Sequence, residues 1–155
     1  QAQISPNWAG NKMIRISKLA DYAVVVLAEM AKEPAVLSAT ALAAATGLSE
    51  TTVAKVLKTL SAKNLLNATR GAAGGYELAR TADQITMRDI IEAMDGPIGI
   101  VDCAEESRAD CQLTDSCKMK SNWSLVNDTI RASLAHITLA EMMAARCNNK
   151  LQGAA

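Results

Sequence analysis

Aromatic residues are scarce in this chain of 155 residues: they make up 3% of it, and phenylalanine is absent. Alanine, leucine, isoleucine, valine and methionine must therefore fill the core, and alanine-rich apolar sequence favours closely packed helices. No run approaches about 18 uninterrupted apolar residues, so no transmembrane helix or other membrane association is predicted. The apolar fraction of 50% excludes a disordered chain. The length fits one domain, or a small domain with one appended element.

The chain also lacks net charge, because 16 Lys and Arg balance 16 Asp and Glu. Composition alone therefore does not indicate a uniformly basic nucleic-acid binder. The charges are unevenly placed, however. Residues 1–82 carry nine basic and five acidic side chains (+4), and residues 83–155 carry seven and eleven (−4). The first half suits a polyanion better than the second, although an imbalance of this size also arises by chance.

The two ends of the chain show little pattern. Residues 1–12 have neither helical nor strand periodicity, and we expect a tag or an upstream extension there; residues 146–155 are expected to form a tail. No signal peptide is recognised, so the expected location is the cytoplasm. In a reducing compartment the four cysteines are expected to be free, metal-binding or redox-active.

The pattern over residues 13–82 predicts a winged helix-turn-helix domain. Helical spacing predicts helices over 17–32, 39–46 and 50–63, with a Gly-Leu-Ser turn between the last two. The second helix of such a pair enters the DNA major groove. The residues of this pair predicted to contact DNA are Ser38, Ser49, Thr51, Thr52, Lys55 and Lys58. A packed hairpin of helices with a solvated lysine face gives the same pattern, so that alternative stays open.

A β-hairpin is predicted next, with strands over 65–69 and 76–79 around a glycine-rich turn. A basic hairpin in this place is typical of a wing that contacts the DNA backbone or a minor groove, here through Arg70 and Gly71. A nucleotide-binding loop is disfavoured, because the Gly-Lys-Ser/Thr ending is missing. The predicted fold class is therefore mainly α with a small β-hairpin wing.

The second half of the chain is predicted to connect the winged helix to a helix that forms a dimer. Residues 83–98 are expected to form a connecting helix, residues 99–117 a cysteine-containing loop, and residues 115–145 one long helix whose pattern breaks near Thr138. So small a winged helix cannot cover the apolar face of a helix of that length. A symmetric homodimer is the expected solution, and it suits a pseudo-palindromic site on double-stranded DNA.

Three cysteines, Cys103, Cys111 and Cys117, lie in an acidic loop with seven and then five residues between them. The two-residue gaps typical of zinc sites are absent, and the wider spacing suits an iron–sulfur cluster. Acidic neighbours oppose thiolate formation and disfavour a simple peroxide sensor. A zinc site and unligated cysteines remain alternatives. The candidates for a fourth ligand are a loop carboxylate, Asp21, Lys120, His136 and Cys147, although His136 is expected to be a half-buried helix residue and Cys147 a tail thiol.

These motifs together resemble the winged-helix iron–sulfur regulators of the IscR and NsrR kind, and most of all the regulators of SUF-type assembly genes. The matching pieces are residues 16–23 (ISKLADYA), 46–49 (TGLS), 70–76 (RGAAGGY), 90–97 (IIEAMDGP), 122–123 (NW), 137–141 (ITLAE) and the three cysteines. The resemblance implies a dimeric DNA-binding repressor or activator. IscR-type proteins carry a histidine where Lys120 stands, and their first cysteine gap is shorter. The NsrR pattern implies Asp21 of the partner subunit as the fourth ligand.

The sequence therefore predicts a regulator of transcription, not an enzyme, that senses iron–sulfur status, oxidants or nitric oxide. The expected cofactor is an iron–sulfur cluster, with 2Fe–2S preferred over 4Fe–4S. The alternative is a regulator of the same fold without a cluster, whose thiols respond to redox change or nitric oxide. An enzyme or electron carrier is disfavoured, because the chain has one histidine and neither a recognisable pair of catalytic carboxylates nor a cofactor loop.

Overall fold

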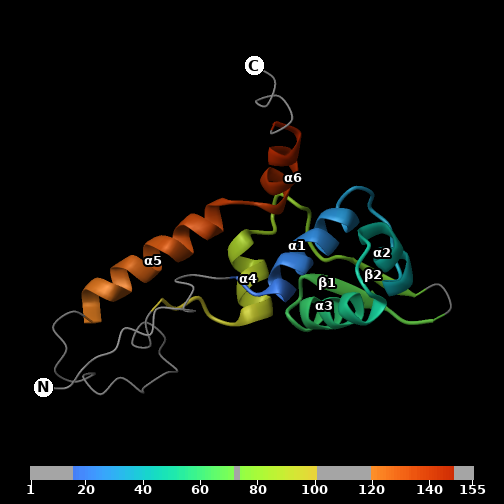
Figure 1. The fold of residues 1–155 in the computed structure, drawn as a ribbon, viewed down its shortest axis with the longest axis horizontal. Helices are drawn as coiled ribbons and strands as arrows, with labels where there is room; N and C mark the ends of the chain where they lie inside the picture. Colours follow the sequence, from blue (N-terminus) through green and yellow to red (C-terminus); the bar gives the residue numbers. More distant parts are fainter. Residues whose placement is uncertain (1–15, 72–73, 101–119, 149–155) are drawn as a thin grey trace, which may run out of the picture.

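The computed structural model describes residues 16–71, 74–100 and 120–148 (Figure 1). The elements in these ranges are α1 (Lys18–Met30), α2 (Ala39–Thr46), α3 (Glu50–Ala62), β1 (Leu66–Thr69), β2 (Gly75–Leu78), α4 (Met87–Asp95), α5 (Lys120–His136) and α6 (Leu139–Asn148). The predicted fold class, mainly α with a hairpin wing, is confirmed. The extension over residues 1–12 and most of the predicted cysteine loop and tail lie outside the described residues.

Local hydrogen bonds explain where the first three helices begin. Ser17, Ser38 and Ser49 each accept a hydrogen bond on the side-chain oxygen from a backbone N–H three residues later, at 3.1 to 3.3 Å. Such N-caps satisfy a donor that the first helical turn leaves unpaired. Gly47 ends α2 with φ +74°, a left-handed conformation that glycine adopts without strain. The turn between α2 and α3 is therefore short and specified by local chemistry.

The core lies between α1, α3 and α4. Its central side chains are fully buried: Leu27, Val53, Val56, Leu57, Leu60, Ile85 and Ile90. Four of these residues form one face of α3, at the spacing that a helix requires. Burial of each leucine or valine contributes roughly 1.5–3 kcal/mol to folding. The buried face therefore determines which residues of α3 point outward.

The wing is attached to the domain along both of its strands. β1 and β2 pair antiparallel, with Leu66 opposite Leu78. On the other edge of β2, Tyr76 and Leu37 exchange two backbone hydrogen bonds of 2.9 Å, so the segment before α2 adds a third, one-residue strand. A Cβ at Gly75 would lie 2.7 Å from the Leu37 carbonyl oxygen. Glycine is therefore needed where this segment crosses the wing.

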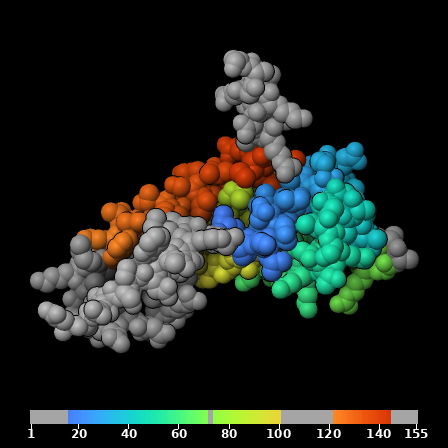
Figure 2. All heavy atoms as spheres, in the orientation of Figure 1, coloured from blue at the N-terminus to red at the C-terminus, as the bar shows by residue number. Residues whose placement is uncertain are grey.

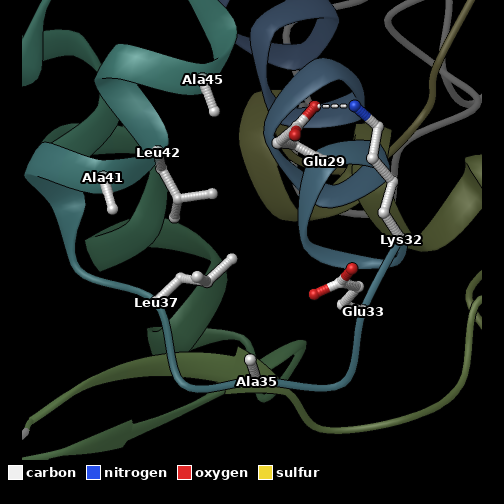
Figure 3. Close-up of a pocket in the computed structure, with 8 residues that line it drawn as sticks. All are labelled: Glu29, Lys32, Glu33, Ala35, Leu37, Ala41, Leu42 and Ala45. Carbon is white, nitrogen blue, oxygen red and sulfur yellow. Dashed lines mark hydrogen bonds and ion pairs between the residues drawn. The ribbon is translucent and has the colours of Figure 1, made fainter.

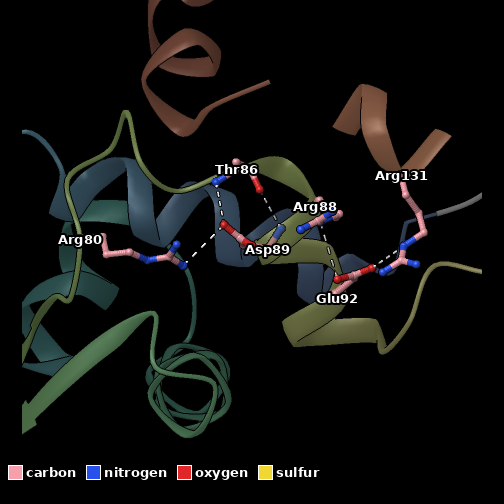
Figure 4. Close-up of polar contacts among 6 residues, drawn as sticks. All are labelled: Arg80, Thr86, Arg88, Asp89, Glu92 and Arg131. Atoms are coloured by element: carbon pink, nitrogen blue, oxygen red, sulfur yellow. Dashed lines mark hydrogen bonds and ion pairs between the residues drawn. The ribbon is translucent and has the colours of Figure 1, made fainter. Parts of the chain in front are cut away.

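A chain of charged side chains runs along α4 (Figure 4). Thr86 and Asp89 form a capping box at its start, and Arg80 reaches the Asp89 carboxylate at 3.5 Å. One turn further on, Oε1 of Glu92 lies 3.1 Å from Nε of Arg131 in α5. The Glu92–Arg131 ion pair therefore connects α5 to the winged helix.

The prediction of one long helix over residues 115–145 is wrong, because α5 ends at His136 and α6 begins at Leu139. Thr138 starts the new helix: its N–H and hydroxyl donate to the Glu141 carboxylate at 2.8 and 3.1 Å, and its hydroxyl accepts from the Glu141 N–H. Backbone bonds of 2.8 Å join Ile137 to Met87, the first residue of α4, and Leu139 to Ile85 just before it. Leu139 is fully buried. The segment between α5 and α6 therefore packs against the winged helix.

α5 differs from the other helices in what it exposes. It extends from the compact part of the molecule as a separate arm (Figures 1 and 2). Trp123 and Val126 are each 43% exposed, and Leu125 is 68% exposed. Leu134, near the other end of α5, packs against the core. The described part of the chain therefore covers one end of α5 and leaves apolar side chains uncovered toward the other.

Candidate nucleic-acid interface

The outward face of α3 is polar. Thr51, Lys55 and Lys58 are exposed along it, and Ala54 lies between them. Within the described residues neither lysine forms an ion pair. This face therefore presents two uncompensated positive charges and a hydroxyl on a rigid helix, with no bulky apolar side chain. Such a surface suits the phosphates and base edges of DNA.

The other hydroxyls predicted to contact DNA also have structural roles. Ser38 is exposed and caps α2. Ser49 caps α3 and shares a hydrogen bond of 2.8 Å with the Thr52 hydroxyl. A hydroxyl has one donor and two acceptor sites, so these bonds leave capacity for a further partner. Thr51 makes no side-chain hydrogen bond within the described ranges, so its hydroxyl keeps its full hydrogen-bonding capacity.

The wing lies beside α3, because β1 packs against that helix (Figure 1). Arg70 follows β1 and is exposed, and it forms no ion pair with any residue that the structure describes. Gly71 has φ +115°, which only glycine adopts readily. The structure thus brings Arg70 and Gly71 to the tip of a hairpin adjacent to α3. Residues 72 and 73 of the tip lie outside the described residues.

Sequence reasoning missed Glu50 and Thr40. The Thr40 hydroxyl of α2 donates to Oε1 of Glu50, the first residue of α3, at 2.7 Å. Both side chains are exposed. An acidic residue directly after an N-cap is usually assigned to the helix dipole, so the sequence carried a signal that suggested only a structural role. The contact between α2 and α3 depends on packing and has no sequence signature.

Asp21 lies apart from α3, on an exposed part of α1. It lines a surface pocket of about 380 Å³ between α1, α4 and α6, with Met87, Ile91 and Met142 among the neighbouring side chains. The carboxylate has no hydrogen bond or ion pair within the described ranges. Its partners in the predicted ligand set, Cys103, Cys111 and Cys117, lie outside the described residues.

Among the residues that the structure describes, no group of three or more potential metal ligands is assembled. His136, which was expected to be half-buried, is exposed, because it is the last residue of α5. Within the same ranges, no helix is both long and apolar enough to cross a membrane.

A pocket of about 310 Å³ lies between the end of α1 and α2 (Figure 3). Its walls are alanine and leucine side chains, and its polar groups include Glu29 and Lys32, which pair with each other. This set of side chains contains no nucleophile with a neighbouring base, so the pocket does not indicate a catalytic site.

The three-helix core, the turn at Gly47 and the antiparallel hairpin define a winged helix-turn-helix protein. The chain belongs to the Rrf2 family, described as iron-dependent transcriptional regulators, whose pattern matches residues 16–145. Regulators of this family bind DNA and are not enzymes. The expected resemblance to winged-helix regulators of the IscR kind is confirmed at the level of this family.

Three comparisons show how close its relatives are. Protein aau3 of Rhizobium meliloti (strain 1021) is 30% identical over 134 residues, which cover 86% of this chain and 87% of that protein. The structure of CymR, the global cysteine regulator of B. subtilis, is 28% identical with a TM-score of 0.64, covering 86% and 98% of the two chains. The structure of T. potens IscR is also 28% identical, with a TM-score of 0.59 and coverage of 92% and 93%.

Proposed function

We propose that the chain regulates transcription as a homodimer that binds a pseudo-palindromic site on double-stranded DNA through α3 and the wing. The observation that carries this proposal is the outward face of α3, where Thr51, Lys55 and Lys58 are exposed opposite a fully buried face. A recognition helix must be rigid to hold side chains at base edges, and the buried face supplies that rigidity. The adjacent Arg70 would add a phosphate contact.

The dimer is supported by the uncovered apolar side chains of α5. Trp123, Leu125 and Val126 are 43 to 68% exposed, and a second copy would remove them from water. A two-fold dimer presents two recognition helices to two half-sites, so half-site spacing follows from the dimer.

The DNA surface is tested by replacing its cations. Lys55→Ala and Arg70→Ala should each weaken binding to DNA, and each should reduce the slope of log affinity against log salt by about one. Lys32→Ala is the matched control, because Lys32 is paired with Glu29 on α1. If Lys55→Ala and Arg70→Ala behave like Lys32→Ala, α3 and the wing are not the DNA surface.

We further infer that Cys103, Cys111 and Cys117 hold an iron–sulfur cluster with Asp21 of the partner subunit as the fourth ligand. A 2Fe–2S cluster is preferred over 4Fe–4S, and genes of SUF-type cluster assembly are the expected targets. Three thiolates and a carboxylate are a donor set that can hold iron, and the exposed, unpaired carboxylate of Asp21 is accessible to another chain. The description of the family as iron-dependent also supports the inference. A bound cluster would make the protein responsive to iron supply, oxidants and nitric oxide.

The test is purification without oxygen, followed by the visible absorption spectrum and the iron and acid-labile sulfide per subunit. We expect coloured protein with matched iron and sulfide, and loss of the colour in Asp21→Ala but not in Asp83→Ala, a control at another exposed aspartate. Colourless protein without iron after attempted reconstitution would contradict the cluster and leave the DNA-binding proposal intact.

A regulator without a cluster is the second candidate. The cysteine regulator CymR and T. potens IscR are each 28% identical in sequence to this chain. Sequence identity therefore favours neither a regulator with a cluster nor one without. In this case the cysteines would respond as thiols to redox change or nitric oxide. Single Cys→Ser variants that remove a redox-dependent change in DNA binding, in protein that holds no iron, would favour this candidate.

A further inference from the structure

We propose that Glu50 determines part of the operator sequence by accepting a hydrogen bond from the exocyclic amino group of a cytosine in the major groove, and that Thr40 orients its carboxylate. This inference rests on the proposed function, because it requires α3 to lie in the major groove. It adds a specificity-determining residue and a positioning residue to a surface otherwise made of cations and hydroxyls.

The position of Glu50 on α3 supports this role. At 3.6 residues per turn, Glu50, Ala54 and Lys58 follow one another along a single ridge of the exposed face. Glu50 begins this ridge as the first residue of the helix. The N-terminal residues of a recognition helix are those that contact base edges. Glu50 therefore lies at the end of α3 that would enter the groove most deeply.

The contact with Thr40 leaves Glu50 able to bind a base. Thr40 donates to Oε1 at 2.7 Å and so holds the carboxylate in one orientation from the neighbouring helix α2. An ionised carboxylate has about four acceptor sites, so Oε2 and one lone pair of Oε1 remain for another donor. Within the described residues Glu50 has no cationic partner. Its orientation is therefore established before DNA arrives, which lowers the entropy lost on binding.

The charge of Glu50 selects its ligand. A carboxylate repels phosphates, so a backbone contact is disfavoured, and it can only accept hydrogen bonds. In the major groove, cytosine presents an amino donor, whereas guanine and thymine present acceptors. Adenine presents a donor beside the N7 acceptor, which would face the carboxylate unfavourably. Cytosine is therefore the expected base, while Lys55 and Lys58 on the same helix supply the attraction to DNA.

A purely structural role makes different predictions. Glu50 could stabilise the start of α3 through the helix dipole and join α2 to α3 through Thr40. Both effects would change the free energy of unfolding and, through it, the affinity for every sequence alike. Neither would alter the preference for one base at one position. Base preference therefore distinguishes the two roles.

The experiment uses the full chain and a pool of DNA duplexes with randomised sequence. The original protein, Glu50→Gln and Thr40→Val are each allowed to select bound duplexes, and base preferences are compared position by position. The original protein should select cytosine at one position in each half-site. Glu50→Gln should reduce that preference about tenfold, with adenine gaining because glutamine can both donate and accept. Thr40→Val should give a smaller reduction at the same position.

Urea unfolding of the three proteins supplies the second measurement. The proposal is overturned if Glu50→Gln keeps the original preference at every position, if all positions weaken together with a loss of stability, or if no cytosine position is selected. Should Glu50→Gln fail to fold, an unchanged preference at this position in folded Thr40→Val would overturn the proposed orienting role. If the original protein selects no sequence at all, the proposed function fails as well. Selection of a defined site that ignores Glu50 would overturn only this inference.

Discussion

The winged helix and the α5–α6 arm use apolar residues in different ways. Leu27, Leu57 and Ile90 of the winged helix are fully buried by contacts within one chain. On α5, Leu125 is 68% exposed and Trp123 is 43% exposed, although both residues are as apolar as those of the core. The winged helix buries these residues within one chain, whereas α5 exposes apolar side chains on a surface that suits another molecule. Apolar composition therefore does not tell which residues stabilise the monomer.

The two regions meet at a well-defined joint. Leu139 is fully buried, and the backbone on either side of Thr138 is bonded to Ile85 and Met87 at the start of α4. Arg131 adds the ion pair with Glu92. The direction of α5 is therefore set relative to α4 and, through the shared core, relative to α3. In the proposed dimer this joint would influence the distance between the two recognition helices.

The largest expected effect contrasts one leucine from each region. Leu57→Ala should lower the free energy of unfolding by roughly 2–5 kcal/mol, because it leaves a cavity in the core. Leu125→Ala makes the same chemical change at an exposed site and should cost less than about 0.5 kcal/mol in the monomer. Urea unfolding at protein concentrations low enough to favour the monomer measures both. Equal losses would contradict the division into two regions.

The wing should show the next largest effect. In Gly75→Ala the new methyl group would meet the Leu37 carbonyl, so the segment before α2 or the hairpin must shift. We expect a loss of roughly 1–3 kcal/mol, with helical content retained and DNA affinity reduced. Circular dichroism, thermal unfolding and DNA titration would measure these quantities. Asn67→Ala, an exposed change on the partner strand, is the control and should leave stability nearly unchanged.

The ion pair at the joint between the two regions should contribute less to the free energy of unfolding. Arg131 is 40% exposed and Glu92 is 26% exposed, so a double-mutant cycle with alanine at both positions should give a coupling of about 0.2–1 kcal/mol. Glu92→Ala should lower the free energy of unfolding more than Arg131→Ala, because it also removes the carboxylate oxygen that lies 3.9 Å from Nε of Arg88. Unfolding in urea at two salt concentrations measures the cycle. A coupling of zero would mean that backbone and apolar contacts alone hold α5 in place.

The smallest expected effect concerns the start of α6. Hydrogen bonds from the backbone and then the side chain of Thr138 lower the pKa of Glu141 from its ordinary value of 4.5. Because the folded pKa is the lower one, the stabilisation is present above the unfolded pKa and is lost as the pH falls through the folded pKa. Glu141→Gln should therefore lower the melting temperature slightly at neutral pH, and the difference should shrink in acid. A constant difference from pH 7 to about pH 3 would contradict this account.

Local signals identified most of the winged helix. The caps at Ser38, Ser49 and Gly47 act through residues at most four positions away, so the bounds predicted for α2 agree with those observed. α4 is shorter than the connecting helix predicted over residues 83–98, because the Thr86 cap begins it and Gly96 ends it. The break in the helical pattern near Thr138 was visible in the sequence, and the Thr-x-x-Glu pattern of a capping box at that position explains why a second helix begins there.

The candidate site divides in a similar way. The exposed lysines of α3 followed from helical periodicity, because a helix that buries one face must expose the other. The pairing of Thr40 with Glu50 did not follow, because it depends on how α2 packs against α3. The proposed cluster ligands stay a prediction, since the three cysteines lie outside the described residues.

Sequence alone therefore specified the three helices of the winged helix, the wing and the family, because each depends on interactions within a few residues or on short motifs. Tertiary structure decided the contacts between distant segments: Leu37 with Tyr76 on the wing, Glu92 with Arg131, and the docking of Leu139. Such contacts form when packing brings together residues tens of positions apart, and no local pattern selects one partner over another. Packing likewise left Leu125 exposed while Leu57, with the same side chain, was buried.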